Sequence, residues 1–360
     1  MKKATVIELG HENGRPQLKG IQGHIHLNLA TEGGITSDGS ISDDPYNKPK
    51  NMFTMLYECF EEDDIDPSMV TLMWGNANAK ELYGMWCEHT NTEPKLNVVS
   101  NQLWLDMWFR MNIDYSDHYD RNYKLDGPLD KLFTCLCRAP RRFRTDLING
   151  LCEYNMLDNI VWTWHGKFED SKLHPELEHL VPKKLDENTT CSGSEVYGTE
   201  FYEATMDKTY FDLVPETFYY NDEVLETPQN TIPDIITEHE GWWNTIFFTE
   251  KTWRCMINKR PFILVGNKGS LAHLHSLGFK TFPHIFDESY DNKQDQDRLQ
   301  HILSQINNID KNVLHNKIFS VETKEILEHN KEVARQLAGN EGRRLYLFSE
   351  GRLDFNKEEA

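Results

Sequence analysis

Short apolar runs alternate with segments of helical spacing through the first third of the chain. The runs with the composition of buried strands are ATVIEL (4–9), HIHLNLA (24–30), VTLMWG (70–75) and LNVVS (96–100). Apolar residues recur at helical spacing in MFTMLYECFEE (52–62) and NQLWLDMWFRM (101–111). This alternation predicts βαβ units and a mostly parallel sheet.

A second series of the same kind follows the turn signal Gly127-Pro128. Its expected strands are KLFTCLC (131–137), NIVWTW (159–164), YFDLVPE (210–216) and PFILVG (261–266). Its expected helices are RTDLINGLCEYN (144–155), TEKTWRCMIN (249–258) and SLAHLHSLG (270–278). An acidic, proline-containing insertion fills 217–245, and the tail from Gln294 to about Gly339 predicts two or three amphipathic helices.

Two consecutive α/β series predict an α/β fold with two Rossmann-like lobes. We place the first lobe at 1–127 and the second at 128–320. Helices are predicted over 321–360 at the C-terminus, and a crossing back to the first lobe is one alternative for them. In such an architecture, ligands belong in the cleft between lobes, at the carboxyl ends of the strands.

The formal charge of −20 disfavours non-specific binding to nucleic acid or to an anionic membrane, although a local basic groove stays compatible with it. The seven cysteines follow no CxxC spacing and indicate neither a disulfide framework nor a zinc site. The N-terminus has no apolar leader and no run approaches membrane-spanning length, so the expectation is a cytoplasmic protein without a membrane partner.

The segment RAPRRFR (138–144) places four arginines between a strand and a helix. Guanidinium groups and the free N–H groups of a helix start both suit phosphate oxygens. The competing interpretation is a solvated basic loop or a nucleic-acid patch.

A second constellation begins the helix at 249–258. Thr249 and Glu250 alone are an ordinary N-cap and an acid that suits the helix dipole. Lys251 opposes that dipole and therefore calls for an anionic partner, which a bound diphosphate would provide. Glu250 would then accept hydrogen bonds from sugar hydroxyls. Glu216 ends the preceding strand and is either a sugar contact or a surface acid.

The segments CLCRAPRRFRTDLINGL, LVPET and FFTEKTWRCMINKRPFILVG occur in this order over roughly 130–290, about half of the chain. This half resembles the donor-binding domain of the α-1,3-fucosyltransferase family and uncharacterised glycosyltransferase-like proteins of phages. The resemblance implies a GT-B fold and transfer of a sugar, with inversion, from a GDP- or UDP-linked donor. It implies no metal and no cofactor beyond that donor.

Carried over by position, Lys251 and either Arg142 or Arg144 hold the diphosphate. Glu250 contacts the ribose or the sugar, and Phe247 stands where the family has a tyrosine. Glu216 and Thr249 are predicted to belong to the same donor site. The acceptor implied is a glycan, a protein or a hydroxymethylated DNA base, the last in the host cytoplasm of a phage. Because the 217–245 insertion departs from the fucosyltransferases and 278–291 is closer to the phage proteins, fucose itself is not inferred.

An inverting transfer needs a base for the acceptor hydroxyl. The candidates are Glu32 and Asp38, in the acidic, glycine-rich loop TEGGITSDGSISDD (31–44) that follows a strand. Taken singly, each is also an ordinary solvated acid of a surface loop.

Two other classes of function remain open. His24 and His26 form an HxH pair of the kind that begins some metal-dependent hydrolases. A non-catalytic protein with a degenerate transferase lobe would bind a nucleotide or nucleic acid instead. In that protein the arginine loop would meet phosphates, and bases would stack on tryptophans that otherwise belong to the core: Trp104, Trp108, Trp162 and Trp164.

Overall fold

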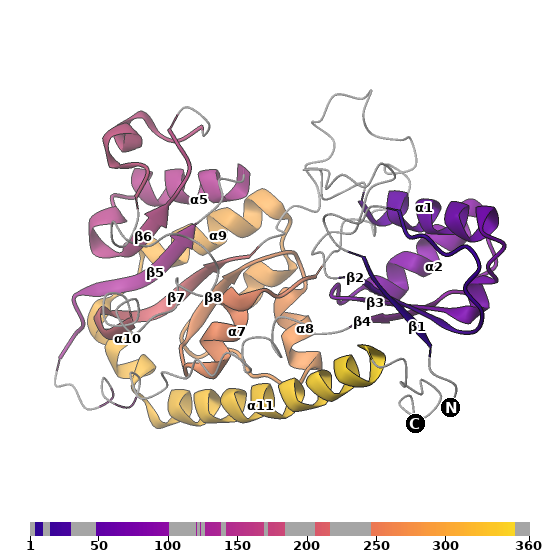
Figure 1. Ribbon diagram of the computed structural model, residues 1–360. Helices are drawn as coiled ribbons and strands as arrows, with labels where there is room; N and C mark the ends of the chain where they lie inside the picture. Colours follow the sequence, from indigo (N-terminus) through magenta and orange to yellow (C-terminus); the bar gives the residue numbers. More distant parts are fainter. Residues whose placement is uncertain are drawn as a thin grey trace. The chain divides into compact units, whose positions relative to one another are not determined.

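Figure 1 shows the computed structural model of the chain. The structure describes residues 4–9, 15–29, 48–100, 120, 123, 127–137, 142–168, 172–183, 206–216 and 246–349. Contacts divide these residues into two compact units. Unit 1 takes the described residues up to Ser100, together with Ile246, Phe247 and the end of the last helix from Leu337 onward. Unit 2 takes the rest.

The division between the units falls earlier in the chain than the predicted boundary at Gly127-Pro128. Asp120 and Tyr123 belong to unit 2, and contacts within that unit explain why. The Nζ of Lys259 donates to Asp120 Oδ2 over 2.8 Å, and the Nζ of Lys324 lies 4.9 Å from the centre of the Tyr123 ring. These contacts connect Asp120 and Tyr123 to the second unit.

Unit 1 contains a parallel sheet in the order β1-β2-β3-β4. Its strands are β1 (Thr5–Leu9), β2 (Ile25–Leu29), β3 (Val70–Trp74) and β4 (Asn97–Ser100). Every residue of β2 and β3 is buried. The crossovers from β2 to β3 and from β3 to β4 run in the same direction, so their helices lie on the same face of the sheet. The covering helices are α1 (Lys48–Glu62) and α2 (Ala79–Thr90), and a short 3-10 helix η1 (Pro67–Met69) leads into β3.

An aromatic cluster joins the two helices of unit 1. The rings of Tyr57 and Trp86 lie 4.6 Å apart, and those of Phe53 and Tyr83 lie 5.2 Å apart. The Tyr83 hydroxyl accepts the backbone N–H groups of Lys95 and Leu96, at 3.0 and 2.9 Å. The cluster therefore packs α1 on α2 and also fixes the start of β4.

Unit 2 contains a second parallel sheet, in the order β6-β5-β7-β8. Its strands are β5 (Lys131–Cys137), β6 (Val161–Trp164), β7 (Thr209–Pro215) and β8 (Phe262–Val265). Its helices are α5 (Arg142–Glu153), α7 (Glu250–Ile257), α8 (Ser270–Ser276), α9 (Asp295–Asn307), α10 (Lys311–Ile318) and the part of α11 (Val321–Ser349) that precedes Leu337. Short 3-10 helices are η2 (Leu157–Asn159), η3 (Pro175–Leu180), η5 (Met206–Lys208) and η9 (Glu288–Asn292).

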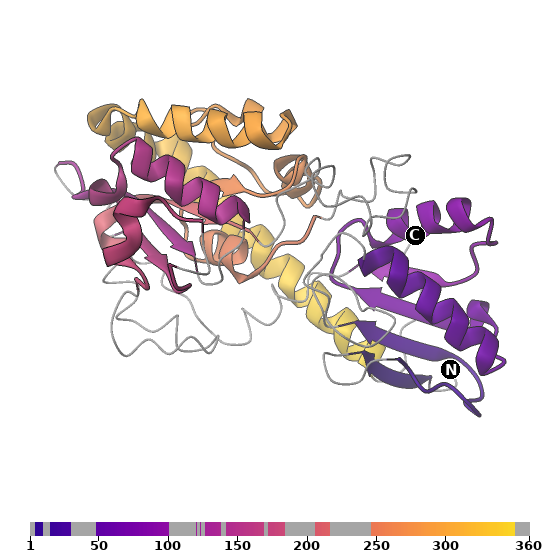
Figure 2. The same ribbon diagram turned by 90° about the horizontal axis from the view of Figure 1, so that it is seen from above.

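The strand order of unit 2 reverses at the boundary between β5 and β7. From β5 the chain moves outward to β6, and it then returns past β5 to continue through β7 to β8. Since parallel crossovers are right-handed, α5 and α7 lie on opposite faces of the sheet, with α9 beside α5 (Figures 1 and 2). Gly150 permits the close contact of α5 with α9, because a Cβ there would lie 2.3 Å from Leu303 Cδ1.

A buried acid in the middle of β7 fixes the C-terminal half of α7. The Asp212 carboxylate accepts Arg254 Nη2 over 3.0 Å and Arg260 Nη2 over 3.2 Å. The Thr134 hydroxyl of β5 and the Cys255 thiol also donate to it. Burial alone would raise the pKa of Asp212, but the two guanidinium groups hold that pKa below its ordinary value.

The sequence predictions of element type agree with the structure wherever they fall on described residues. Two parallel sheets confirm the α/β class, and the tail forms three helices, of which α11 continues past Gly339 to Ser349. The helix predicted at 101–111 lies outside the described residues. Within the described part of the chain, none of the helices combines the length and the apolar character needed to cross a membrane.

We expect Asp212→Asn to lower the free energy of unfolding by about 3–5 kcal/mol, because it leaves two buried guanidinium groups without their carboxylate. Denaturant titration measures the loss, and Asp297→Asn, an exposed acid on α9, is the matched control. Since the folded-state pKa of Asp212 is depressed, its contribution is complete above its ordinary pKa and disappears as the pH falls through the folded value. A variant as stable as the wild type at neutral pH would contradict this role.

Candidate functional site

The carboxyl ends of β5 and β7 bring several of the predicted site residues together. Arg144, in the first turn of α5, donates from Nη2 to the carbonyls of Pro215 and Glu216, at 3.1 and 3.0 Å. The Glu216 carboxylate in turn binds Thr249, where α7 begins. Segments far apart in the sequence therefore meet where the strand order of the sheet reverses. In open α/β sheets this is where ligands bind.

Glu216 follows β7 and holds the start of α7. Its Oε1 accepts the backbone N–H of Thr249 over 3.1 Å and the hydroxyl of Thr252. Its Oε2 accepts the Thr249 hydroxyl over 2.7 Å. The residue is only 2% exposed, so any contribution to ligand binding acts through the residues that it positions.

Thr249 is the N-cap residue of α7, as its sequence context indicates. Its Oγ1 accepts the N–H of Lys251 over 3.3 Å and the Nζ of the same lysine over 2.8 Å, while its proton goes to Glu216. These three bonds use the full capacity of a hydroxyl group. Thr249 is completely buried. It therefore contributes to the predicted donor site by capping α7, without touching a ligand itself.

Lys251 has partners within the protein, which corrects one step of the sequence argument. Its Nζ lies 3.2 Å from Glu250 Oε1 and 3.9 Å from Glu216 Oε2, and its side chain is 16% exposed. Two carboxylates therefore offset the unfavourable position of this cation at a helix start, and no external anion is required for charge balance. The prediction that Lys251 binds a diphosphate rests on where it lies, at the sheet edge.

Glu250 is the more accessible acid of the group, with a side chain that is 21% exposed. Burial acts to raise its pKa, but the Lys251 ammonium and the N–H groups at the helix start more than offset this. The pKa of Glu250 is therefore held below its ordinary value, and the group is an anionic hydrogen-bond acceptor at neutral pH. An acceptor of this kind suits hydroxyl groups of a ribose or a sugar.

The two arginines considered for the diphosphate differ in their surroundings. Arg144 is 3% exposed, and its Nη2 donates hydrogen bonds to two backbone carbonyls, so it joins α5 to the end of β7. Arg142 is the first residue of α5, and its side chain lies outside the described residues, as do Arg138 and Arg141. Arg144 therefore has a structural role. The diphosphate contact stays a prediction for the arginine loop that precedes it.

Three other predicted residues do not join this group in the described structure. Phe247 is 6% exposed, and its contacts group it with unit 1. The proposed bases Glu32 and Asp38 lie outside the described residues. Their predicted roles stay predictions.

The features behind the two alternative functions have structural roles where the structure describes them. His24 pairs with the Thr71 hydroxyl over 2.9 Å, its ring lies edge-on to His26 at 5.3 Å, and no third His, Cys, Asp or Glu of the described residues completes a metal cluster with them. Trp162 and Trp164 are 2% and 0% exposed, which confirms that they are core residues and unavailable to bases. Trp104 and Trp108 lie outside the described residues.

Thr252 is a site residue that the sequence argument missed. Its hydroxyl reaches the same carboxylate oxygen of Glu216 that accepts the N–H of Thr249. The spacing Thr-x-x-Thr was visible in TEKT, because residues three apart lie on the same side of a helix. The hydrogen-bond acceptor, Glu216, could not be predicted as the partner, because it lies on another segment of the chain.

No protein-family model, curated protein or solved structure matches the chain significantly.

We expect Thr249→Ala to lower the free energy of unfolding by about 1–3 kcal/mol, since it removes an N-cap and a donor to a buried carboxylate. Thr249→Ser keeps the hydroxyl and is the matched control. Both variants are compared by urea denaturation. Equal losses in the two variants would show that the methyl group and its packing matter, rather than the hydroxyl.

Proposed function

We propose that the protein is a glycosyltransferase that binds the nucleotide diphosphate of its sugar donor at the carboxyl edge of the unit 2 sheet. The observation that carries this proposal is the meeting of Glu216, Glu250 and Lys251 at the point where the strand order reverses. Such points favour nucleotide binding because strand ends and helix starts converge there. The sequence resemblance to fucosyltransferases and phage glycosyltransferase-like proteins supports the same site.

In this proposal, the residues at the carboxyl edge of the unit 2 sheet have different roles. Lys251 and the arginines of the 138–142 loop stabilise the charge that grows on the departing diphosphate, as a metal ion does in other transferases. The described part of the site holds two carboxylates, Glu216 and Glu250, and two cationic side chains, Arg144 and Lys251. This part is formally neutral, so the positive excess that attracts a diphosphate comes from the loop.

The reaction proposed is transfer with inversion. The acceptor oxygen attacks the anomeric carbon, the bond to the diphosphate oxygen breaks on the opposite side, and the hydroxyl proton passes to a carboxylate base. Glu32 and Asp38 remain the candidates for this base. Glu250 would orient the donor by accepting hydrogen bonds from its hydroxyl groups. The acceptor class stays open among a glycan, a protein and a modified DNA base.

A thermal-unfolding screen against GDP, UDP, ADP and CMP and their sugar conjugates tests the proposal. We expect one nucleotide to raise the melting temperature selectively, because a ligand at about 100 times its Kd adds about 2.7 kcal/mol of stability. Each shift is measured against the same buffer without nucleotide, with and without EDTA, and we expect equal shifts in both. If none of the nucleotides shifts the transition, the proposed donor site is wrong. A shift without any sugar transfer or donor hydrolysis would favour the non-catalytic alternative.

Lys251→Ala gives a sharper test of the site. Loss of one charge-assisted contact to a phosphate is worth about 1.5–3 kcal/mol, so we expect the Kd of the nucleotide identified above to rise roughly 10- to 150-fold. The measurement is titration calorimetry on folded protein, since loss of the internal contacts of Lys251 also lowers stability. The matched control is Lys208→Ala, an exposed lysine in η5 just before the amino end of β7. An unchanged Kd for Lys251→Ala would overturn the assignment.

A further inference from the structure

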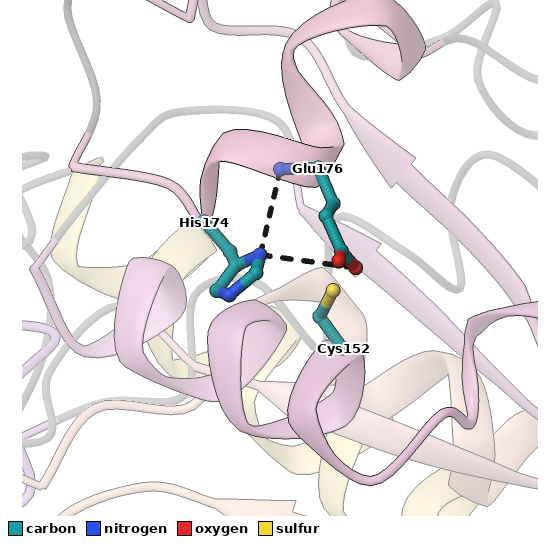
Figure 3. A group of neighbouring side chains, drawn as sticks. All are labelled: Cys152, His174 and Glu176. Carbon is teal, nitrogen blue, oxygen red and sulfur yellow. Dashed lines mark hydrogen bonds and ion pairs between the residues drawn. The ribbon is translucent and has the colours of Figure 1, made fainter.

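Figure 3 shows a second group of polar side chains in unit 2, formed by Cys152, His174 and Glu176. Cys152 lies in the last turn of α5, His174 is the N-cap residue of η3, and Glu176 lies in the first turn of η3. One ligand atom from each of the three lies within 4.8 Å of the other two. The proposed donor site uses none of these residues.

The loop that carries His174 is attached to α5 beside this cluster. Asn149 lies one helical turn before Cys152, and its Oδ1 accepts the N–H of His174 over 2.7 Å. Its Nδ2 donates to the carbonyl of Lys172 over 2.9 Å. Both ends of one amide therefore hold the loop against the helix. The imidazole and the thiol are brought together by these contacts, so their proximity does not depend on side-chain rotation alone.

The imidazole directs its Nδ1 atom toward Glu176. The single lone pair of His174 Nδ1 accepts the N–H of Glu176 over a long 3.4 Å, so a metal ion on this nitrogen would replace that bond; the same Nδ1 lies 4.0 Å from Glu176 Oε2. Figure 3 shows the Cys152 sulfur beside this carboxylate. A thiol, an imidazole nitrogen and a carboxylate thus lie within 4.8 Å of one another.

This set of donors has the chemistry of a zinc site. Zinc binds cysteine sulfur, histidine nitrogen and carboxylate oxygen at about 2.0–2.3 Å, which places tetrahedral ligands about 3.3–3.8 Å apart. The present separations of up to 4.8 Å close by roughly 1 Å through side-chain rotation, and Glu176, with a 78% exposed side chain, has that freedom. A thiolate ligand disfavours magnesium and calcium, which prefer oxygen.

A nucleophilic cysteine is the competing interpretation of the same three groups. A reactive thiol needs a positive environment that favours its anion. Cys152 has acidic neighbours instead, Glu176 and Glu153, and a bound dication would offset their charge together with that of the thiolate. Of the six described cysteines, all with free thiols, the other five are buried, so Cys152 is the most accessible of those the structure describes.

We propose that Cys152, His174 and Glu176 bind one zinc ion, with an open fourth position for water. The ion would connect the end of α5 to the segment that begins η3, and it would add a third connection to the two made by Asn149. Because α5 returns antiparallel to the strands, its C-terminal end lies toward the amino edge of the sheet, opposite to Glu250 and Lys251. The ion would therefore lie away from the proposed donor site, which does not use it.

Cobalt substitution tests the proposal on the full chain. Chelator-treated, reduced protein is titrated with Co²⁺, and the thiolate-to-cobalt charge-transfer absorption is followed. We expect the band to saturate at one equivalent and to disappear when Zn²⁺ is added, while Mg²⁺ has no effect. Cys152→Ser removes the band, and His174→Ala or Glu176→Gln raises the Kd at least about tenfold. His179→Ala and Glu178→Gln are matched controls on the same short helix and leave the titration unchanged.

Metal-free melting temperatures show whether each variant folds. We expect Cys152→Ser to melt close to the wild type without metal, and Zn²⁺ to raise the transition of the wild type and the two controls only. A charge-transfer band that persists in Cys152→Ser would place the metal on another cysteine and overturn the proposal. Absence of the band in the wild type, or an unchanged Kd in His174→Ala, would overturn it equally.

Discussion

Two buried carboxylates on one strand fix the helix on which the candidate site depends. Asp212 and Glu216 stand four residues apart at β7 and its end, so both face the side of the sheet that α7 covers. Asp212 binds Arg254 and Glu216 binds Thr249, one near each end of the helix. A helix of eight residues has little stability of its own. The desolvation cost of each acid is offset by donors from α7 and the residues around it, so the geometry at the start of α7 is strongly specified.

The sequence predicted most of the elements because parallel strands are continuous apolar runs. It did not predict the order β6-β5-β7-β8, since strand order depends on how each crossover returns to the sheet. Asp212 was also missed, because a single acid inside YFDLVPE resembles an interruption of the apolar run. Its partners Arg254 and Arg260 stand 42 and 48 residues away in the sequence. Long-range pairs of this kind leave no local pattern.

The candidate site was predictable in part, for a similar reason. Local rules found the cap at Thr249 and the charged pair that follows it. They could not show that Glu216 and Glu250 partner Lys251, or that Arg144 binds backbone carbonyls, because both facts depend on where β7 ends. The cluster of Cys152, His174 and Glu176 was equally hidden, since Cys152 stands on a segment separate from the other two, and Asn149 attaches the His174 loop to α5 through contacts that leave no local pattern.

The most direct test of the central claim is a crystal structure of the protein with the nucleotide that stabilises it most. The account predicts a diphosphate at the carboxyl edge of the unit 2 sheet, with a phosphate oxygen within about 3.2 Å of Lys251 Nζ and a ribose or sugar hydroxyl equally close to Glu250. A nucleotide bound elsewhere, with Lys251 still paired to Glu250 and Thr249 alone, would contradict it.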